Sequence, residues 1–518
     1  MLSVFTKPIE LDEEDRAINI KLNSFGKPHM RAFHLSWISF LTAFTAWFAI
    51  PPLIPTLKKE LKLTDDEIGN SNLTSGMPLL FHHRVCLTKC FPLLTTIIQF
   101  SNQTVGATIG ARLVVGPLCD RYGPKRVMAV LLFMGAITIG LTGFVSNGTG
   151  LIVIRFFIGI LGAAFVPCQF WTTKMFSPNI VGTANALAGG WGNMGGGLTY
   201  LVMPLLFNGF AMVAPVGIAW RVALVVPALL CIFVGLLDYY LGDDCPEGDW
   251  FQKKKAELEK MEAPIVDEKI DIERDLERTD GKLGGEVKLA SKQEISKHVG
   301  DSSKKSSTII SALSVVLKDH TVIVLMLQYA CSFGLELAVD NVIGNFFYVR
   351  FGMDQTTSGM LGSIFGLLNI VSRPSGGFFA DRLNKVIGQG VQGRILAQQL
   401  MTLFEGVFLI AFSYSTGSLA SAIAVMILFS FFVQATCGTT FSMAPFVNRE
   451  HFGLLAGLIG AGGNLGGVIF NFVFKAYGVN YEAAFKTIGV VVVCVSLLTL
   501  VARVQGEMLW MLVVKPRK

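Results

Sequence analysis

The chain has 518 residues, of which 52% are hydrophobic and only 15% are charged. Soluble domains carry roughly 45 to 50% apolar and about 25% charged residues, so this composition excludes an ordinary soluble domain and indicates an integral membrane protein. The net charge of +6 falls largely in loops and tails, which favours a signal for membrane orientation over nucleic-acid binding. The nine cysteines show no disulfide framework or repeated zinc spacing, so we expect free thiols.

Residues 1–33 are polar and of mixed charge, with Glu10, Asp12 and Lys21 among them. They contain no cleavable signal peptide, and we expect a cytoplasmic N-terminal tail. Twelve apolar runs follow, each close to the roughly 17 to 25 residues that span a bilayer as a helix. We expect these helices at 34–56, 104–119, 126–146, 150–173, 182–207, 217–241, 320–347, 357–380, 393–414, 417–440, 453–474 and 484–504.

A long polar stretch divides the predicted helices into two sets of six. Residues 34–242 form the first half and residues 319–506 the second, and residues 507–518 form a second cytoplasmic tail. The stretch between the halves, residues 243–318, is rich in Lys, Glu, Asp and Ser. Such a composition cannot bury a core and predicts a largely solvated cytoplasmic linker with some helix.

Two glycine-rich runs lie at 188–197 and 460–467, in corresponding apolar segments of the two halves. Glycine inside a helix costs roughly 1 kcal/mol relative to alanine, so each run indicates close approach of helices, either for packing alone or around a central cavity. Each run also holds one asparagine, Asn193 or Asn464, whose amide can contact a ligand. The glycines concerned are Gly189, Gly190, Gly192, Gly195, Gly196, Gly462, Gly463, Gly466 and Gly467.

Two arginines lie inside apolar segments at equivalent positions of the halves. Arg112 precedes the acidic residue Asp120 by eight positions, as Arg373 precedes Asp381. A charge at the bilayer centre costs from roughly 2.5 kcal/mol upward, so it normally faces a cavity on a substrate or ion path. Pairing with a carboxylate to brace the helices is the alternative, but neither helix core contains an acid. Two planar guanidinium forks at one cavity favour a flat oxyanion such as nitrate.

Basic loops follow the second and eighth predicted helices. The loop after the second helix carries the motif residues Gly116, Asp120, Arg121, Gly123 and Arg126. Lys and Arg concentrate in cytoplasmic loops, so we expect both loops in the cytoplasm. An even number of helices then places both termini on the same side.

Residues 76–103 interrupt this pattern. Their apolar part, residues 91–100, is too short to cross roughly 30 Å of hydrocarbon, and a thirteenth crossing would separate the two basic loops. We therefore expect an atypical extracellular insertion, interpreted as a retained intron, with a re-entrant loop as the alternative. His82, His83, Cys86 and Cys90 lie within it, but nothing else in the sequence completes a metal site and we expect none.

These features together resemble the major facilitator superfamily. The stretch from Gly116 to Arg126 is similar to the superfamily's loop between helices two and three, and residues 377–382 are a weaker copy of it. The paired glycine-rich runs resemble the signatures of the nitrate/nitrite porter family, and most of all those of eukaryotic high-affinity nitrate transporters. The resemblance implies an all-α membrane protein with the major facilitator fold, in which twelve transmembrane helices form two pseudo-symmetric six-helix halves.

The resemblance also implies a function and a site. It implies a secondary active transporter in the plasma membrane that imports nitrate and possesses no cofactor. The substrate site is then formed by Arg112, Arg373, Asn193 and Asn464. An aromatic clamp on the anion is implied as well, with Phe165 on one helix and with Tyr329 and Phe333 on another, where their spacing of four places them on one face.

Eukaryotic members of this family are similar to proton symporters, which need a protonatable group that responds to the site. The intramembrane acids are Glu336, Asp340 and Glu405, and the sequence leaves all three open. Nitrite as a second substrate and an accessory subunit also stay open. The alternative functions are a nitrate/nitrite exchanger and a transporter-like nitrate sensor. No nucleophile with a base, metal set or phosphate loop appears, so we do not expect an enzyme.

Overall fold

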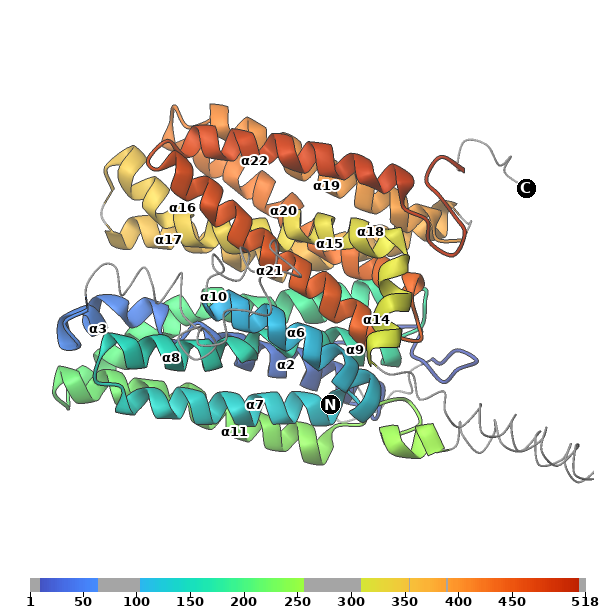
Figure 1. Ribbon diagram of the computed structural model, residues 1–518, viewed down its shortest axis with the longest axis horizontal. Coiled ribbons are helices and arrows are strands. Elements are labelled where there is room, and N and C mark those ends of the chain that lie inside the picture. Colours follow the sequence, from blue (N-terminus) through green and yellow to red (C-terminus); the bar gives the residue numbers. More distant parts are fainter. Residues whose placement is uncertain (1–9, 64–102, 256–308, 354, 388–389, 512–518) are drawn as a thin grey trace, which may run out of the picture.

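The computed structural model describes residues 10–63, 103–255, 309–353, 355–387 and 390–511. Within these ranges the chain is helical, and its only β pairing consists of isolated bridges. Figure 1 shows the first half of the chain, in blue and green, beside the second half, in yellow to red, with most helices running in similar directions. The expected insertion lies outside the described residues except for Gln103, which begins a helix.

The first half is built mainly from long helices joined by short connections. Its elements are α2 (His29–Trp47), η1 (Pro51–Leu53), α3 (Ile54–Glu60), α6 (Gln103–Tyr122), α7 (Pro124–Leu141), η3 (Thr142–Phe144), α8 (Gly148–Ile158), η4 (Gly159–Ala164), α9 (Phe165–Met175), α10 (Val181–Ala211) and α11 (Val216–Leu241).

The second half repeats this organisation after a short leading helix. Its elements are α14 (Ile309–Lys318), α15 (His320–Tyr329), η5 (Ala330–Gly334), α16 (Leu335–Phe351), α17 (Gln355–Leu367), η6 (Leu368–Ile370), α18 (Ser372–Ile387), α19 (Gln392–Tyr414), α20 (Leu419–Val447), α21 (Phe452–Tyr477), α22 (Tyr481–Ser496) and η7 (Leu497–Val501).

Ten helical segments of the described chain are long and apolar enough to cross a membrane. They coincide with ten of the twelve expected spans, and α6 and the segment α17–η6–α18 occupy the positions of the other two. These two segments carry the buried arginines, which lowers their hydropathy. The architecture is thus that of an all-α membrane protein and is consistent with twelve spanning segments. Large apolar side chains are exposed on the bundle, as lipid-facing residues are; Ile137, Leu201 and Phe233 are examples.

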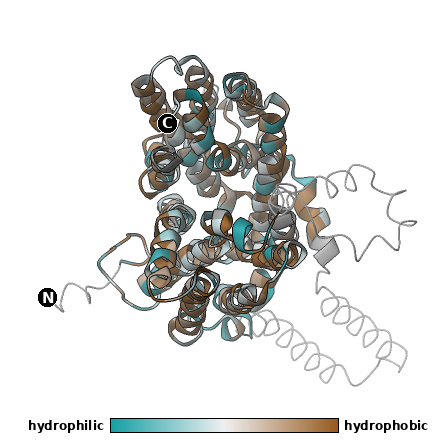
Figure 2. Cartoon of the chain, turned by 90° about the vertical axis from the view of Figure 1, so that its left-hand side faces the viewer, coloured by the Kyte–Doolittle hydropathy of each residue, from teal (hydrophilic) through white to brown (hydrophobic). Residues whose placement is uncertain are grey.

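Several helices extend beyond the apolar runs that predicted them. The first spanning helix begins at His29, five residues before the expected start, and α10 ends at Ala211, after the expected end. Figure 2 shows the two halves as two groups of helices in which hydrophobic residues prevail. Polar residues at helix ends continue the backbone hydrogen bonding without adding to the apolar signal, which explains the short predictions.

Each glycine-rich helix packs against the arginine-bearing helix of the opposite half, α21 on α6 and α10 on α18. A Cβ atom added to Gly457 would lie 2.5 Å from the carbonyl oxygen of Arg112, and one added to Gly190 would lie 2.7 Å from the carbonyl oxygen of Asn369. Only glycine permits backbones to approach this closely. The pseudo-symmetry of the sequence is therefore also present in the packing between the halves.

Two of the irregular turns inside spanning segments lie next to residues of the expected clamp. The 3-10 turn η4 connects α8 to α9, and the π turn η5 connects α15 to α16. Short π turns inside α-helices are frequent at functional sites. Phe165 directly follows η4, Tyr329 precedes η5, and Phe333 belongs to it, so both irregular turns position residues of the expected clamp.

Polar segments outside the spans fold against the first half. Ala17 is fully buried and pairs with Phe176 in an isolated bridge. Arg31 forms a salt bridge of 2.8 Å with Asp243, at the start of the expected linker. The central part of that linker, residues 256–308, lies outside the described residues.

Candidate functional site

The two arginines lie together in the interior of the bundle, although they come from different halves. Arg112 on α6 is 0% exposed and Arg373 on α18 is 1% exposed. The guanidinium carbons lie 5.3 Å and 5.5 Å, respectively, from the ring centroid of Phe165. Their distances from the ring centroid of Phe333 are 5.1 Å and 5.9 Å. The structure therefore brings both arginines to the same pair of aromatic rings.

Each guanidinium is fixed by hydrogen bonds to neutral oxygens. Arg112 donates from Nε to the carbonyl of Gly162, at 3.0 Å, and from Nη1 to the carbonyl of Gly460, at 2.7 Å. Arg373 donates from Nη2 to the hydroxyl of Tyr329, at 2.7 Å. Nη2 of Arg112 and Nη1 of Arg373 have no partner among the described residues. A buried cationic donor without a partner is costly, so this site is suited to an acceptor-only anion.

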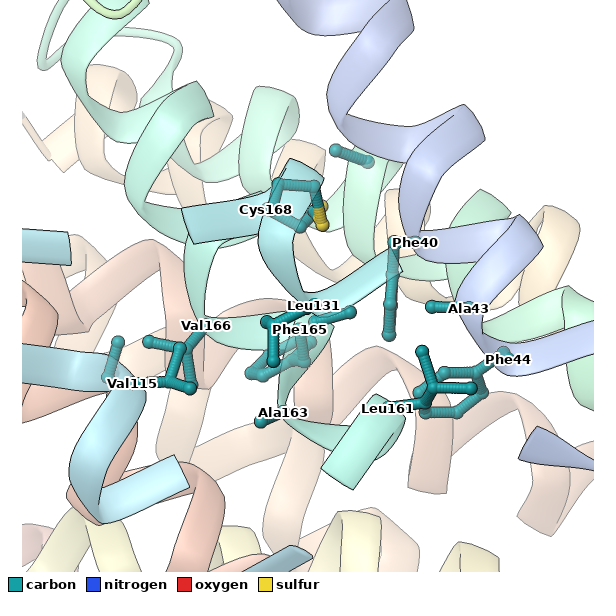
Figure 3. Close-up of a cluster of buried hydrophobic side chains, with 14 of the residues drawn as sticks. Phe40, Ala43, Phe44, Val115, Leu131, Leu161, Ala163, Phe165, Val166 and Cys168 are labelled. Atoms are coloured by element: carbon teal, nitrogen blue, oxygen red, sulfur yellow. The ribbon is translucent and has the colours of Figure 1, made fainter. Parts of the chain in front are cut away.

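The three rings of the expected aromatic clamp lie close together and are nearly parallel. Phe165 faces Tyr329 at 6.0 Å between centroids, with 20° between the planes. It faces Phe333 at 6.4 Å and 12°. Figure 3 shows Phe165 among buried apolar neighbours, including Phe40 and Val166. An ion sandwiched between two rings needs about 7 Å from ring to ring, so the clamp must open slightly to hold one there.

A fourth ring, Phe441 on α20, completes this aromatic cluster. It meets Phe165 edge to face at 4.7 Å and 87°, and Tyr329 at 5.2 Å and 75°. The sequence alone does not predict this residue. Phe165 lies in the fourth spanning segment of the first half and Phe441 in the fourth of the second. The comparison of equivalent positions that links the two arginines would also have identified Phe441.

Some signature glycines make room for the site itself. A Cβ on Gly189 would lie 2.9 Å from Nε2 of Gln169 and 3.4 Å from Nε of Arg373. A Cβ on Gly463 would lie 2.6 Å from Cδ1 of Tyr329. A larger residue at either position would displace a side chain of the site.

Other signature glycines allow a neighbouring helix of the same half to approach. In α10 they face α2: Gly192 contacts Phe40, and a Cβ on Gly195 would lie 2.5 Å from the carbonyl oxygen of Leu41. In α21 they face the helix that contains η5, where Gly466 contacts Ala330. A Cβ on Gly462 would lie 2.9 Å from the carbonyl oxygen of Met326, whereas Gly467 and Gly196 have more room, with nearest atoms at 3.4 Å and 3.5 Å.

The amide nitrogens of the two signature asparagines both donate hydrogen bonds within the protein. Asn193 donates to Oε1 of Glu336 at 2.7 Å, and Asn464 donates to the carbonyl of Gly460 in its own helix at 3.2 Å. Their amide oxygens have no partner among the described residues. Because an amide oxygen is an acceptor, it does not favour an anion, and a role of either asparagine as a nitrate ligand remains a prediction.

The three candidate acids occupy different environments. Glu336 is 1% exposed and accepts hydrogen bonds from the amides of Asn193 and Asn369. Asp340 lies one turn further along α16 and is exposed. Glu405 on α19 is fully buried, and its two oxygens have no partner in the described part of the chain. Glu336 thus accepts hydrogen bonds from both halves of the molecule.

The loop motif of the first half connects α6 to the other half. Asp120 accepts hydrogen bonds from the backbone N–H groups of Gly453, at 3.0 Å, and Leu454, at 2.9 Å. These groups belong to the first turn of α21, where unpaired N–H groups favour a carboxylate. A Cβ on Gly116 would lie 2.5 Å from the carbonyl oxygen of Gly453, so the same glycine lets the two backbones meet.

The rest of the motif holds the chain on the first half. Gly123 has a φ of 83°, a conformation that favours glycine, and a Cβ there would lie 2.6 Å from Oδ1 of Asp244. Burial raises the pKa of the Asp244 carboxyl above its ordinary value. Arg126 forms a salt bridge of 2.8 Å with Asp249, and Arg121 lies over the ring of Tyr122.

The weaker copy of the motif, residues 377–382, connects the second half to the first. Asp381 accepts hydrogen bonds of 2.6 Å from the backbone N–H and the hydroxyl of Thr183, near the start of α10. Arg394 forms an ion pair with the same carboxylate. Each half therefore caps the signature helix of the other half, and both caps lie at the same end of the bundle.

The comparisons with known proteins agree with this architecture. Residues 36–471 match the family model described as "Major Facilitator Superfamily". In structure, the chain is similar to the proton:xylose symporter XylE, with a TM-score of 0.58 and 14% sequence identity, covering 93% of this chain and 98% of that one. It is also similar to the human organic anion transporter MFSD10, with a TM-score of 0.56 and 15% identity, covering 92% and 100%. At this identity the structures support the fold alone.

Sequence relatives narrow the assignment. The chain is 33% identical to "High affinity nitrate transporter 2.5" of Arabidopsis thaliana, over 94% of this chain and 82% of that protein. It is 33% identical to "High-affinity nitrate transporter 2.3" of Oryza sativa subsp. japonica, over 95% and 81%. It is 34% identical to "Nitrate transporter 2.2" of Chlamydomonas reinhardtii, over 89% and 76%. The chain therefore belongs to the major facilitator superfamily, and within it to the family of these nitrate transporters.

Proposed function

We propose that this chain imports nitrate across the plasma membrane as a secondary active transporter driven by protons. The observation that carries the proposal is the pair of buried guanidiniums, Arg112 and Arg373, each with an N–H group that has no partner among the described residues. Nitrate is planar, carries one negative charge and offers three acceptor oxygens. The relatives named as nitrate transporters support the same substrate.

The charges of the site favour an anion. The guanidiniums of Arg112 and Arg373 outnumber the single carboxyl of Glu336, so the site stays cationic whether or not that carboxyl is ionised. The rings of Phe165 and Phe333 give the site an apolar lining, so a weakly hydrated ion enters it at a lower desolvation cost than a strongly hydrated one such as sulfate or phosphate. Nitrite shares the plane and the charge but has one oxygen fewer, so we propose it as a weaker second substrate.

Alternating access requires the two halves to rock about the midplane site. The basic loops indicate that the end with Asp120 and Asp381 is cytoplasmic, and we propose this orientation with both termini inside. The carboxylate caps on α21 and α10 then hold the cytoplasmic ends of the halves together in the form seen here. Release of nitrate to the cytoplasm requires both caps to break.

Uptake of isotopically labelled nitrate by cells that lack their own nitrate transporter tests the proposal. We expect saturable uptake that depends on the chain, increases at acidic external pH, and is accompanied by an inward current. Exchange of external nitrate for internal nitrite without net current would instead support the exchanger. Nitrate binding without flux would support the sensor.

A further inference from the structure

Glu336, in the second half, accepts a short hydrogen bond from the first glycine-rich run, residues 188–197. Its Oε1 atom accepts the amide N–H of Asn193 on α10, at 2.7 Å, and the amide N–H of Asn369 in η6. The first donor belongs to the N-terminal half, and the second belongs to the same half as Glu336. A carboxyl group buried in the midplane region is thus held by donors from both halves.

This arrangement suits both forms of the carboxyl. An ionised carboxylate only accepts hydrogen bonds. Oε1 has two donors, whereas among the described residues Oε2 has a single weak contact, with Sγ of Cys437 at 3.9 Å. Oε2 is therefore the atom available to a proton. A protonated acid needs an acceptor, and the Oδ1 atoms of Asn193 and Asn369 are without partners among the described residues.

Glu336 also lies within the electrostatic reach of the substrate site. Its carboxyl interacts with the guanidinium of Arg373, which is the group with a spare N–H for the anion. The other titratable side chains that act on it come from α20, α15, α19 and α16 itself, while α10 and η6 contribute the two neutral amides. These titratable groups are Cys437, Tyr329, Glu405 and Asp340.

We propose that Glu336 binds the transported proton, and that Asn193 is a positioning residue which connects its protonation to the packing of the two halves. The inference rests on the proposed nitrate function and selects one of the three candidate acids. It also gives the first signature asparagine a role other than contact with nitrate.

The coupling follows from competition for Arg373. While Glu336 is ionised, its charge partly neutralises Arg373 and opposes a second anion beside it. A proton on Oε2 removes that charge, so nitrate binds more tightly, and by linkage nitrate also makes the proton bind more tightly. Protonation further turns the charge-assisted hydrogen bond from Asn193 into a neutral and weaker one, which loosens a contact between the halves.

The proton has an entry point beside the site. Asp340 follows Glu336 by one helical turn on α16 and is exposed, and the two carboxyls interact electrostatically. The proton moves from water to Asp340 and then to Glu336, and it leaves to the cytoplasm when the halves have rocked. No covalent bond other than O–H is made or broken.

The test uses the full chain in proteoliposomes, with nitrate affinity and nitrate exchange measured between about pH 5 and about pH 8. We expect the nitrate affinity of the wild type to fall about tenfold per pH unit above the transition, as one linked proton requires. Glu336→Gln keeps an acceptor for both asparagines but cannot ionise. This variant should bind nitrate with the same affinity at every pH and exchange nitrate across the membrane, yet fail to accumulate it in a pH gradient.

Two further variants test the roles of Asn193 and Glu336 separately. Asn193→Ala removes a donor that stabilises the ionised carboxylate, so the midpoint of the pH profile should rise by about one unit; a purely structural role would lower activity without moving the midpoint. Glu405→Gln should keep the wild-type profile. An unchanged midpoint in Asn193→Ala, a wild-type pH dependence in Glu336→Gln, or its loss in Glu405→Gln would each overturn the assignment.

The outcomes separate this inference from the function on which it rests. A wild-type chain that binds no nitrate at any pH would contradict the proposed function itself. A wild-type chain that binds and transports nitrate with an affinity independent of pH would leave the function in place and contradict only the role of Glu336.

Discussion

The guanidinium of Arg112 donates a hydrogen bond of 2.7 Å to the carbonyl oxygen of Gly460, and this bond joins the two halves of the molecule. Arg112 belongs to α6 of the first half, and Gly460 opens the second glycine-rich run in α21. A Cβ on Gly460 would lie 3.0 Å from both Cδ and Nη1 of Arg112. The second glycine-rich run thus holds Arg112 of the opposite half, the residue proposed to bind nitrate, so the position of Arg112 depends on how the halves are packed.

Replacing either Arg112 or Arg373 with lysine should reduce nitrate uptake at least about tenfold while surface expression stays unchanged. Lysine keeps the charge but has a single nitrogen, which cannot bond two carbonyls and an anion in a fixed plane. Labelled uptake and surface biotinylation measure the two quantities. Arg350→Lys is a matched control, because Arg350 is an exposed residue whose salt bridge with Glu482 is distant from the site. Uptake above a third of the wild type in both site variants would contradict the requirement for the planar guanidinium group at these positions.

Signature glycines should differ in their tolerance of a methyl group. Gly463→Ala brings a Cβ to within 2.6 Å of the Tyr329 ring, whereas Gly196→Ala meets its nearest atom at 3.5 Å, an ordinary contact. We expect a loss of uptake of about tenfold or more at position 463 and near-normal uptake at position 196, since overpacking costs about 1 to 3 kcal/mol. Concentration-dependent uptake checks both variants. Equal effects would mean that the runs act through overall helix packing alone.

Asp120→Asn should favour opening of the cytoplasmic end. The substitution removes the charge that faces the N–H groups of Gly453 and Leu454, and about 1 kcal/mol of this interaction corresponds to about a five-fold shift in population. Cys119, buried beside Asp120, is a native reporter, and its alkylation by a maleimide should become faster.

The buried Cys231 on α11 serves as the internal reference for that experiment. Asp249→Asn is the matched control, because it removes the salt bridge with Arg126 at the same end but within one half. Alkylation of Cys119 that rises equally in both variants, or in neither, would show that the Asp120 cap does not hold the halves together.

Deletion of residues 76–103, which joins Ser75 to Thr104, should give equal or better expression and higher nitrate flux. The described helix α6 has 20 residues, which at 1.5 Å per residue span about 30 Å, so it can cross a bilayer without the preceding segment. Expression and uptake of the deletion variant, together with sequencing of spliced transcripts, test this. An inactive or degraded deletion protein beside an active full-length form would show that the segment is a structural element.

The sequence predicts those site residues that are energetically unfavourable in an ordinary apolar helix. A guanidinium inside an apolar run and a glycine run inside a helix are both unfavourable locally, so each pointed to a special environment, and the structure brings Arg112, Arg373 and the glycines together. Phe441 had no such signal, because one phenylalanine among 40 carries little information. The clamp residues Phe165, Tyr329 and Phe333 were found through resemblance for the same reason.

Individual hydrogen bonds between residues distant in sequence could not be predicted. The hydrogen bond between Asn193 and Glu336 joins residues 143 positions apart, and it depends on how the two halves dock. The π turn η5 is equally a product of packing, since Gly463 and Gly466 of α21 press against it. Local helix propensity contains neither feature. The loop motif with Asp120 is visible in the sequence, but the cap that Asp120 forms on α21 is seen only in the structure.

Calorimetric titration of the purified chain with nitrate tests the central claim most directly, because it measures the anion site without requiring transport. We predict binding of one nitrate per chain at acidic pH, no comparable binding of sulfate, and loss of nitrate binding in the double variant Arg112→Lys, Arg373→Lys, whose fold is verified by its circular dichroism. Nitrate binding that survives in a folded double variant, or its absence from the wild type, would contradict the account.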